Sequence, residues 1–185
     1  MELTDAALVA TARAGDRDAF RALVERHSRS LFRLAYRMTG HEQDAEDVVQ
    51  DTFLRAYNNL GKFDGRASFG SWLYRIAANS SLDLLRSRKR TAEDDIDDPL
   101  HSPRSTNPSP ERLAMSGEVR ERLAEAMREL SPTERTAFVL RHFEGLSIED
   151  VSRALECQTS AAKHSVFRAV QKLRRALEPL ASPAK

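Results

Sequence analysis

The last third of the sequence contains cationic side chains whose spacing suits the binding of a polyanion. Every charged side chain between residues 163 and 175 is basic: Lys163, Arg168, Lys172, Arg174 and Arg175. A solvated helix face usually mixes both signs of charge. Small and hydroxylated residues come just before this run, and they allow a helix N-terminus to approach a phosphate group. The chemistry that this pattern favours is binding to nucleic acid.

Two helices separated by a tight turn must position these side chains. Helical periodicity covers residues 147–155 and resumes from residue 159 to about residue 177, with a break of turn length between. This spacing predicts a helix-turn-helix whose second helix lies in the major groove. Thr159 is expected to cap that helix, with Ser160 in its first turn. Lys163, His164 and Ser165 are placed to meet base edges, and Arg168 and Lys172 to meet phosphates. An ordinary solvated helix is the alternative.

An earlier predicted helix, over residues 41–60, carries an unusual acidic ridge on its outer face. The residues expected there are Asp44, Asp47, Asp51, Leu54 and Arg55. Acids in the first helical turn are favoured by the helix dipole, which accounts for Asp44 and Asp47 without any partner. Asp51 lies further along, beside an outward leucine, and suggests a docking face for a basic protein surface. Spacing alone does not decide between these two interpretations.

A third predicted helix, over residues 68–90, has a polar stripe between two apolar stripes. The stripe consists of Ser71, Arg75, Asn79, Leu82 and Arg86, and it is a candidate surface for reading nucleic acid. The helix ends in several cations, which equally fit compensation of the helix dipole. The preceding loop, residues 62–68, combines an aromatic residue, two cations and a glycine, a composition suited to holding an unstacked base.

Composition predicts an all-α protein of two small helical domains joined by a flexible acidic linker. The chain has 185 residues, of which 41% are hydrophobic and 31% charged, and no convincing strand pattern occurs. Residues 91–110 hold four of the seven prolines and a run of acids, and they have too few apolar residues to offset their ordering entropy. We therefore expect domains over residues 1–90 and 113–185, with a linker over residues 91–112.

The sequence offers little support for an enzyme, a cofactor or a metal site. The five histidines are scattered without ligand spacing, and glycine-rich phosphate motifs are absent. The one cysteine, Cys157, cannot form an internal disulfide and is expected to be a small packed residue. No signal peptide or membrane-spanning run is recognisable. We therefore predict a cytoplasmic protein that binds nucleic acid and does not insert into a membrane.

Together, four stretches of the chain resemble a known family, the extracytoplasmic-function (ECF) sigma factors of bacterial RNA polymerase. The stretches are DAFRALVERHSRSLFRLAYRMTG, DAEDVVQDTFLRAYNNLGKFDGRASFGSWLYRIAANSSLD, LSPTERTAFVLRHFEGLSIEDVSRAL and AAKHSVFRAVQKLRRAL. The resemblance covers nearly the whole chain, and it implies sigma region 2 in the first domain and sigma region 4 in the second. The linker would follow the RNA exit path of the polymerase.

The resemblance also implies partners and residue roles. The partners are core RNA polymerase, through its β′ coiled coil and its β subunit, promoter DNA and an anti-sigma factor. The residues implied for polymerase binding are Asp44, Asp47, Gln50, Asp51 and Leu54. Those implied for the minus-10 element are Lys62, Phe63, Asp64, Arg66, Ser68, Arg75, Asn79 and Arg86. The helix-turn-helix, with the seven residues named above from Thr159 to Lys172, would read the minus-35 element.

Two departures from the family limit what can be transferred. Relatives commonly open the recognition helix with glycine-threonine-valine-lysine-serine-arginine, whereas this chain has Ser160-Ala161-Ala162-Lys163-His164-Ser165. The base preference therefore cannot be copied from a relative. Only one tryptophan, Trp72, is present, and it lies on the predicted buried side, so we expect weaker strand opening and few promoters. A stand-alone helix-turn-helix regulator is the alternative function, and it would not need the acidic ridge.

Overall fold

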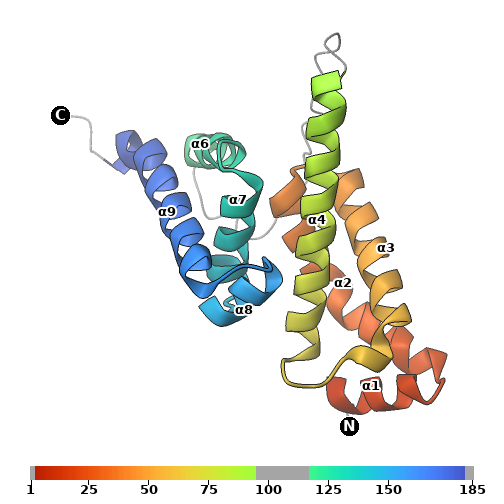
Figure 1. The fold of residues 1–185 in the computed structure, drawn as a ribbon. Coiled ribbons are helices and arrows are strands. Elements are labelled where there is room, and N and C mark those ends of the chain that lie inside the picture. Colours follow the sequence, from red (N-terminus) through yellow and green to blue (C-terminus); the bar gives the residue numbers. More distant parts are fainter. Residues whose placement is uncertain (1–2, 95–116, 182–185) are drawn as a thin grey trace.

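The computed structural model describes residues 3–94 and 117–181, and every regular element within these ranges is helical (Figure 1). The predicted all-α fold class is confirmed. The first half contains α1 (Asp5–Arg13), α2 (Arg17–Thr39), α3 (Glu42–Asn58), the short 3-10 helix η1 (Leu60–Lys62) and α4 (Phe69–Asp94). The second half contains α6 (Gly117–Arg128), α7 (Pro132–Phe138), the π-helical turn η2 (Val139–Phe143), α8 (Ile148–Ala154) and α9 (Thr159–Ala181).

Helix ends follow the signals in the sequence. The Ser131 hydroxyl accepts a hydrogen bond from the Glu134 amide, and the Glu134 carboxylate accepts one from the Ser131 amide, so the two residues form a capping box at the start of α7. Gly40 ends α2 with φ 78°, and Gly145 follows η2 with φ 68°. Both glycines adopt the left-handed conformation that other residues rarely take, so the chain turns sharply there.

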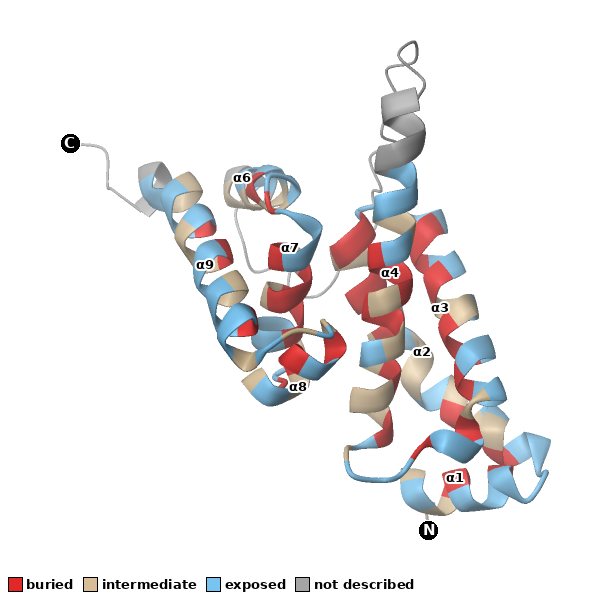
Figure 2. Cartoon of the chain, in the orientation of Figure 1, coloured by how far each residue is buried: buried red, intermediate tan, exposed pale blue. Residues whose placement is uncertain are grey.

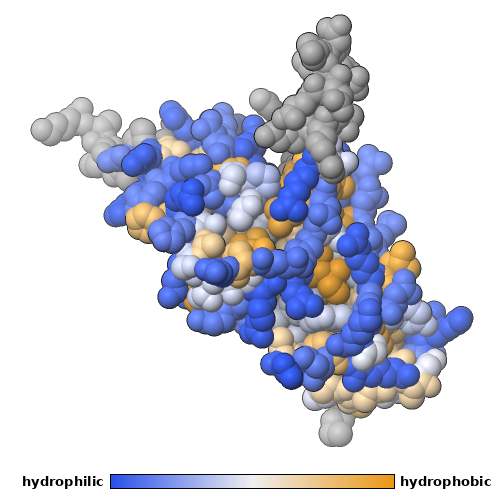
Figure 3. All heavy atoms as spheres, in the orientation of Figure 1, coloured by the Kyte–Doolittle hydropathy of each residue, from blue (hydrophilic) through white to orange (hydrophobic). Residues whose placement is uncertain are grey.

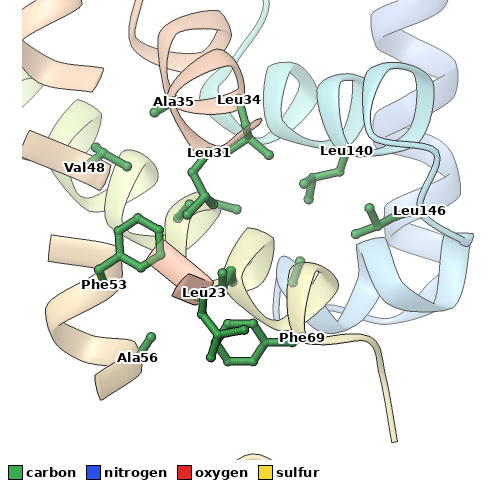
Figure 4. Close-up of a cluster of buried hydrophobic side chains, with 14 of the residues drawn as sticks. Leu23, Leu31, Leu34, Ala35, Val48, Phe53, Ala56, Phe69, Leu140 and Leu146 are labelled. Atoms are coloured by element: carbon green, nitrogen blue, oxygen red, sulfur yellow. The ribbon is translucent and has the colours of Figure 1, made fainter. Parts of the chain in front are cut away.

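Three helices of the first half, α2, α3 and α4, pack around an apolar core (Figures 1 and 4). The largest fully buried side chains of these helices are Leu23, Leu31, Leu34 and Met38 of α2, Val48 and Thr52 of α3, and Leu73 and Ser81 of α4. Within α2, Leu31, Leu34 and Met38 recur at three- and four-residue steps, as an amphipathic helix requires. The arrangement leaves the outer side of α3 in solvent, shown in pale blue in Figure 2.

The structure adds a short helix, α1, over residues 5–13, for which the sequence pattern gives no separate bounds. Thr4 caps this helix by accepting a hydrogen bond from the Ala7 amide. Its buried side chains are Leu8, Val9 and Ala12. At its C-terminal end, the Arg13 guanidinium donates hydrogen bonds to the carbonyls of Leu60 and Phe63. Helix α1 therefore packs beneath the bundle and holds the segment that precedes α4.

In the second half, α8, a tight turn and α9 form the predicted helix-turn-helix. The turn contains Glu156 with φ 52°, a left-handed conformation in a non-glycine residue. The Gln158 carbonyl accepts the hydrogen bond from the Ala162 amide, so Gln158 occupies the capping position. Thr159 is the first residue of α9, and its expected role as the cap is therefore wrong.

The two halves pack against each other, whereas the sequence predicted separate tethered domains. Helix α4 packs against α7 and α8, and α2 packs against α7 and η2. Leu140 and Leu146 of the second half belong to the same cluster of buried side chains as Leu31 and Leu34 of α2 (Figure 4). Apolar side chains of the second half therefore extend the core of the first.

The boundaries of the predicted linker are only partly described. Helix α4 continues to Asp94, four residues beyond the expected end of the first domain at residue 90. Residues 91–94 contain neither glycine nor proline, so nothing in their sequence stops the helix. The expected start of the second domain at residue 113 and the rest of the predicted linker lie outside the described residues, and α6 is described from Gly117.

Candidate nucleic-acid interface

Helix α9 presents the predicted DNA-facing side chains on one side. Ser160, Lys163, His164, Arg168 and Lys172 are exposed, and Thr159 and Ser165 are half-buried. The opposite side of the helix packs on the second half through Ala162, Ala169 and Leu173, all of them buried. Helix α9 packs against α6, α7 and α8, and it lies on their far side from α4 (Figure 1). In the orientation of Figure 1, the molecular surface is mostly hydrophilic, with hydrophobic residues in separate patches (Figure 3).

The cations of this face differ in how freely they can approach a phosphate. Lys172 Nζ lies 2.7 Å from Glu134 Oε2, so its charge is already neutralised within the protein. Lys163 and Arg168 have no ion-pair partner among the described residues. Helix α9 therefore offers Lys163 and Arg168 as free cations, while Lys172 ties α9 to the start of α7.

The ion pair of Lys172 makes stability depend on the charge of Glu134. Burial raises the pKa of the Glu134 carboxyl group, but hydrogen bonds from Lys172 and Ser131 outweigh burial and hold that pKa below its ordinary value. A carboxyl group with a lowered pKa in the folded state stabilises the fold above its unfolded-state pKa. The contribution is lost as pH falls through the folded-state value.

We expect Glu134→Gln to reduce the free energy of unfolding at pH 7 by about 1 kcal/mol. Glutamine preserves the capping box, so the loss reports the charge. The difference from the wild type should shrink as pH falls below about 4. Urea denaturation at both pH values measures it, with the exposed Glu125→Gln of α6 as the matched control. A loss of equal size at both pH values would contradict the role of the ion pair.

An exposed aromatic side chain on α9 was missed by the sequence analysis. Phe167 is 62% exposed and lies four residues after Lys163 and three after His164, so it shares their face. Exposed phenylalanine is unfavourable in solvent and suits apolar contact with a partner. The available signal was an aromatic residue outside the apolar stripe formed by Val166, Val170 and Leu173.

The loop before α4 keeps its polar side chains in solvent but not its aromatic one. Lys62, Asp64, Arg66 and Ser68 are exposed. Phe63 is only 9% exposed, with its ring centroid 5.6 Å from that of Phe69 and 5.2 Å from that of Trp72. The Phe63 ring is therefore not exposed for stacking on a base in this structure, because it anchors the loop to the core.

The polar stripe of α4 is interrupted. Arg75 is exposed and Asn79 half-buried, but Leu82 is only 4% exposed, so its expected place on an open stripe is wrong. Arg86 is exposed, with Nη1 3.6 Å from Asp83 Oδ1. The Asn79 amide donates a hydrogen bond of 3.4 Å to Glu156 of the helix-turn-helix. Arg75 and Arg86 are therefore the exposed residues among those expected to read the nucleic acid from this helix.

The acidic ridge of α3 is smaller than the sequence predicted. Asp44 is 5% exposed, and its Oδ1 lies 2.5 Å from Arg88 Nη2, so its expected place on the outer face is wrong. The end of α4 covers this part of α3, because residues 44 positions apart in sequence pair there. Asp47 and Gln50 remain exposed.

Two large side chains with apolar surface lie on the same exposed side of α3 as Asp47 and Gln50. Leu54 is 61% exposed, as expected, and Tyr57, which the sequence analysis did not select, is 48% exposed. Asp51 is half-exposed and structural: its carboxylate accepts hydrogen bonds from Ser80 Oγ at 2.6 Å and from Arg55 Nε at 3.0 Å. Asp51 thereby joins α3 to α4. The open docking face consists of Asp47, Gln50, Leu54 and Tyr57.

Other kinds of site find no support in the described part of the chain. Among residues 3–94 and 117–181, no group of three or more His, Cys, Asp or Glu side chains could hold a metal ion. In the same residues, no helix combines the length and apolar character needed to cross a membrane. Cys157 is half-buried and packs against the apolar core, as expected.

Comparison with known families and sequences assigns both halves. The family model for sigma-70 region 2 matches residues 23–91, and that for sigma-70 region 4 matches residues 120–173. The RNA polymerase sigma-H factor of Pseudomonas aeruginosa is 35% identical over 184 residues, covering 95% of each chain. The ECF RNA polymerase sigma-E factor of Haemophilus influenzae is 32% identical over 186 residues, covering 97% of this chain and 98% of the relative.

Solved structures resemble the whole fold. The sigma factor RpoE of Bartonella quintana, in complex with the anti-sigma factor NepR, superimposes with a TM-score of 0.71 at 25% identity. The match covers 86% of this chain and 96% of that one. CnrH, in complex with the cytosolic domain of CnrY, gives a TM-score of 0.66 at 30% identity and covers 95% and 97% of the two chains.

Proposed function

The chain belongs to the ECF sigma factors of RNA polymerase, and we propose from this membership how its surfaces divide the work of transcription initiation. Members of this family are transcription initiation factors, as the resemblance implied. The first half binds core polymerase and the minus-10 element, and the second half binds the minus-35 element. The observation that carries the proposal is the presence of both sigma regions, in order, on one chain.

We place the polymerase contact on the open docking face of α3. Asp47 and Gln50 supply polar groups, and Leu54 and Tyr57 supply exposed apolar area, with the Tyr57 ring held in place by an edge-on contact with Phe20. A basic coiled coil, the β′ element implied by the family, complements this combination. Asp44 and Asp51 act indirectly, by fixing α3 against α4 through Arg88 and Ser80. The second half is proposed to contact the β subunit.

We place minus-10 recognition on the loop and the exposed edge of α4. Lys62 and Arg66 are exposed cations, and Arg75 is exposed on the helix. These side chains suit contact with phosphates and with unstacked bases. Phe63 supports the loop from inside through its contacts with Phe69 and Trp72. Recognition of a flipped base is therefore assigned to the polar side chains of the loop.

We place minus-35 recognition on α9. Its N-terminal turn approaches the phosphate backbone, and Lys163, His164 and Ser165 reach base edges, as in other helix-turn-helix proteins. Arg168 contacts a phosphate. Lys172 instead holds α9 against α7 through Glu134. The DNA-facing side of α9 therefore offers fewer free cations than the sequence predicted.

The remaining proposals follow from family membership. An anti-sigma factor is a fitting partner, since a similar sigma factor was solved in complex with one. The chain itself is not expected to be an enzyme, because the polymerase performs the chemistry. Its place of action is proposed to be the cytoplasm, where core polymerase works. No cofactor is required by these roles.

In vitro transcription on a genomic DNA library tests the proposal and identifies the promoters. Core polymerase is supplied with or without the chain, and new RNA starts are mapped. We expect starts that appear only when the chain is present. The alternative, a stand-alone helix-turn-helix regulator, predicts tight operator binding without polymerase and no new starts.

Phe167 provides a test of base contact on α9. An exposed phenylalanine in the major groove is suited to contact with a thymine methyl group. We expect Phe167→Ala to lower the affinity of the holoenzyme for a mapped promoter by about fivefold to tenfold. The salt dependence should stay unchanged, because no phosphate contact is removed. Electrophoretic mobility shifts measure both. An equal loss on promoter and unrelated DNA would contradict the base contact.

A further inference from the structure

The loop before α4, which we assign to minus-10 recognition, has little backbone structure of its own. Among the described residues, those numbered 64–67 take part in no backbone–backbone hydrogen bond. Locally, the Asp64 carboxylate accepts a hydrogen bond of 3.0 Å from the Arg66 amide, and the two side chains form an exposed ion pair at 3.4 Å. An exposed pair of this kind contributes little to stability. The shape of the loop therefore depends on contacts with other elements.

Arg13, the last residue of α1, supplies the contact at the start of the loop. Its Nε donates a hydrogen bond of 3.0 Å to the Leu60 carbonyl, and its Nη2 donates one to the Phe63 carbonyl. The same guanidinium lies over the Phe63 ring, 5.9 Å from its centroid. A guanidinium holds its donors in a rigid planar fork, whereas an ammonium group is a compact point charge. We call the contacts of Arg13 with Leu60 and Phe63 the loop clamp.

Helix α1 is itself fixed to the bundle, so the position of Arg13 does not depend on the loop. At the start of α1, the Asp5 carboxylate lies 2.6 Å from Arg26 Nη1 and 2.8 Å from His27 Nε2. Three buried apolar side chains attach the rest of the helix to α2. The end of α1 then reaches η1, beside the loop (Figure 1).

The far end of the loop is fixed as well. The Ser68 hydroxyl accepts a hydrogen bond of 3.1 Å from the Ser71 amide, at the start of α4. The next ring, Phe69, meets the His27 ring edge-on at 5.7 Å between centroids. Residues 64–66 lie between these two anchor points and are exposed. The loop clamp and the start of α4 therefore present a short exposed tip to a partner.

Two simpler explanations of Arg13 exist. A cation in the last turn of a helix compensates the helix dipole, and an exposed cation can contact a phosphate directly. Lysine performs either role, because both require only positive charge. The donors of Arg13, however, point to carbonyls 47 and 50 residues away in the sequence. This arrangement requires the guanidinium fork and favours a role in holding the loop.

We propose that Arg13 is a positioning residue for minus-10 recognition, which holds the loop through the loop clamp in the shape that reads an unstacked base. The inference rests on the proposed role of the loop. An ordered loop loses less conformational entropy when it binds, and it admits the correct base in one geometry. Without the loop clamp, the tip with Asp64 and Arg66 adapts to different bases. Loss of Arg13 therefore lowers selectivity among bases at the minus-10 element.

Trp72 fluorescence on the full-length chain tests the loop clamp without polymerase or DNA. Trp72 is the only tryptophan of the chain, and its ring centroid lies 5.2 Å from that of Phe63. We expect Arg13→Ala and Arg13→Lys to shift its emission to longer wavelength and to increase quenching by acrylamide, because the Phe63 ring is released. Arg13 is exposed, so circular dichroism should show unchanged helix content. Arg17→Ala, which removes an exposed cation of α2, is the matched control and should change neither signal.

The second measurement is the base selectivity of the holoenzyme. Its affinity is determined for a mapped promoter and for every single-base variant of the minus-10 and minus-35 elements. A wrong base typically lowers affinity by about fivefold or more. We expect both Arg13 variants to reduce discrimination at one minus-10 position by about fivefold. Discrimination at the minus-35 element and the salt dependence should stay unchanged, because no phosphate contact is removed.

Three results would overturn the proposal. The first is a wild-type Trp72 signal or wild-type selectivity in both Arg13 variants. The second is wild-type behaviour of Arg13→Lys alone, because positive charge would then suffice. The third is a flatter salt dependence in Arg13→Ala, which would identify a direct phosphate contact. Failure of the proposed function would look different, because the wild type itself would then show no preference at any minus-10 base.

Discussion

Replacing Asp47 by lysine and Leu54 by alanine is expected to weaken binding to core RNA polymerase by a factor of about 100. Both side chains lie on the exposed side of α3, and Leu54 is 61% exposed, so the changes should leave folding intact. The double substitution removes an apolar contact and reverses a complementary charge. Together, these changes reduce the binding free energy by about 3 kcal/mol. Titration of core polymerase into the fluorescently labelled chain measures the affinity.

The matched control makes the same two kinds of change elsewhere. Asp18→Lys and Leu3→Ala also reverse an exposed aspartate and truncate an exposed leucine, and they should leave the affinity unchanged. Asp51→Lys is unsuitable for this purpose, because Asp51 accepts a hydrogen bond from Ser80 and its loss would disturb α4. Equal losses in the control and the α3 variant would contradict the docking face.

Replacing Lys163 and Arg168 together by alanine is expected to lower the affinity of the holoenzyme for its promoter by about 30-fold or more. Both cations are exposed on α9 and have no ion-pair partner in the described part of the chain. Each one that contacts a phosphate should also flatten the dependence of log affinity on log salt by about one unit. Binding titrations at several salt concentrations give both quantities.

Lys172→Ala is the informative comparison on the same helix. Lys172 is paired with Glu134, so its removal should change the salt dependence much less than removal of Arg168. The sequence predicts both Arg168 and Lys172 as phosphate contacts, but only Lys172 has an ion-pair partner in the described part of the chain. If Lys172→Ala flattened the salt dependence as strongly as Arg168→Ala, the intramolecular pair would not persist in the complex.

Local signals in the sequence predicted the helices well. The capping box of Ser131 and Glu134 and the glycines at positions 40 and 145 all mark helix ends in the structure. Their effects depend on atoms within a few residues, so a single sequence suffices to recognise them. The bounds of α1 are not predicted separately, because only three of its nine residues are buried, which is too few to define a period.

Properties that depend on distant residues could not be predicted in this way. Helical spacing placed Asp44 with Asp47, but only the fold brings Arg88 and the end of α4 over Asp44. The aromatic residue of the loop suggested stacking on a base, whereas Phe69 and Trp72 enclose Phe63. The type of a residue determines its chemistry. Contacts with residues distant in the sequence determine whether its side chain is exposed to solvent.

The packing of the two halves illustrates the same limit at a larger scale. The proline-rich acidic segment indicated two separate domains, and that segment lies mostly outside the described residues. The interface instead includes Leu140, Leu146 and the ion pair between Arg37 and Glu144, which look like ordinary core and surface residues in the sequence. Composition can indicate a linker, but it does not say whether the domains that it joins touch each other.

The most direct test of the central claim is run-off transcription from one mapped promoter with purified core polymerase. The account predicts a specific transcript only when the chain is present, and its loss when either the minus-10 or the minus-35 element is scrambled. A transcript of the same start and amount without the chain, or one that survives scrambling of both elements, would contradict the claim that this protein directs promoter recognition.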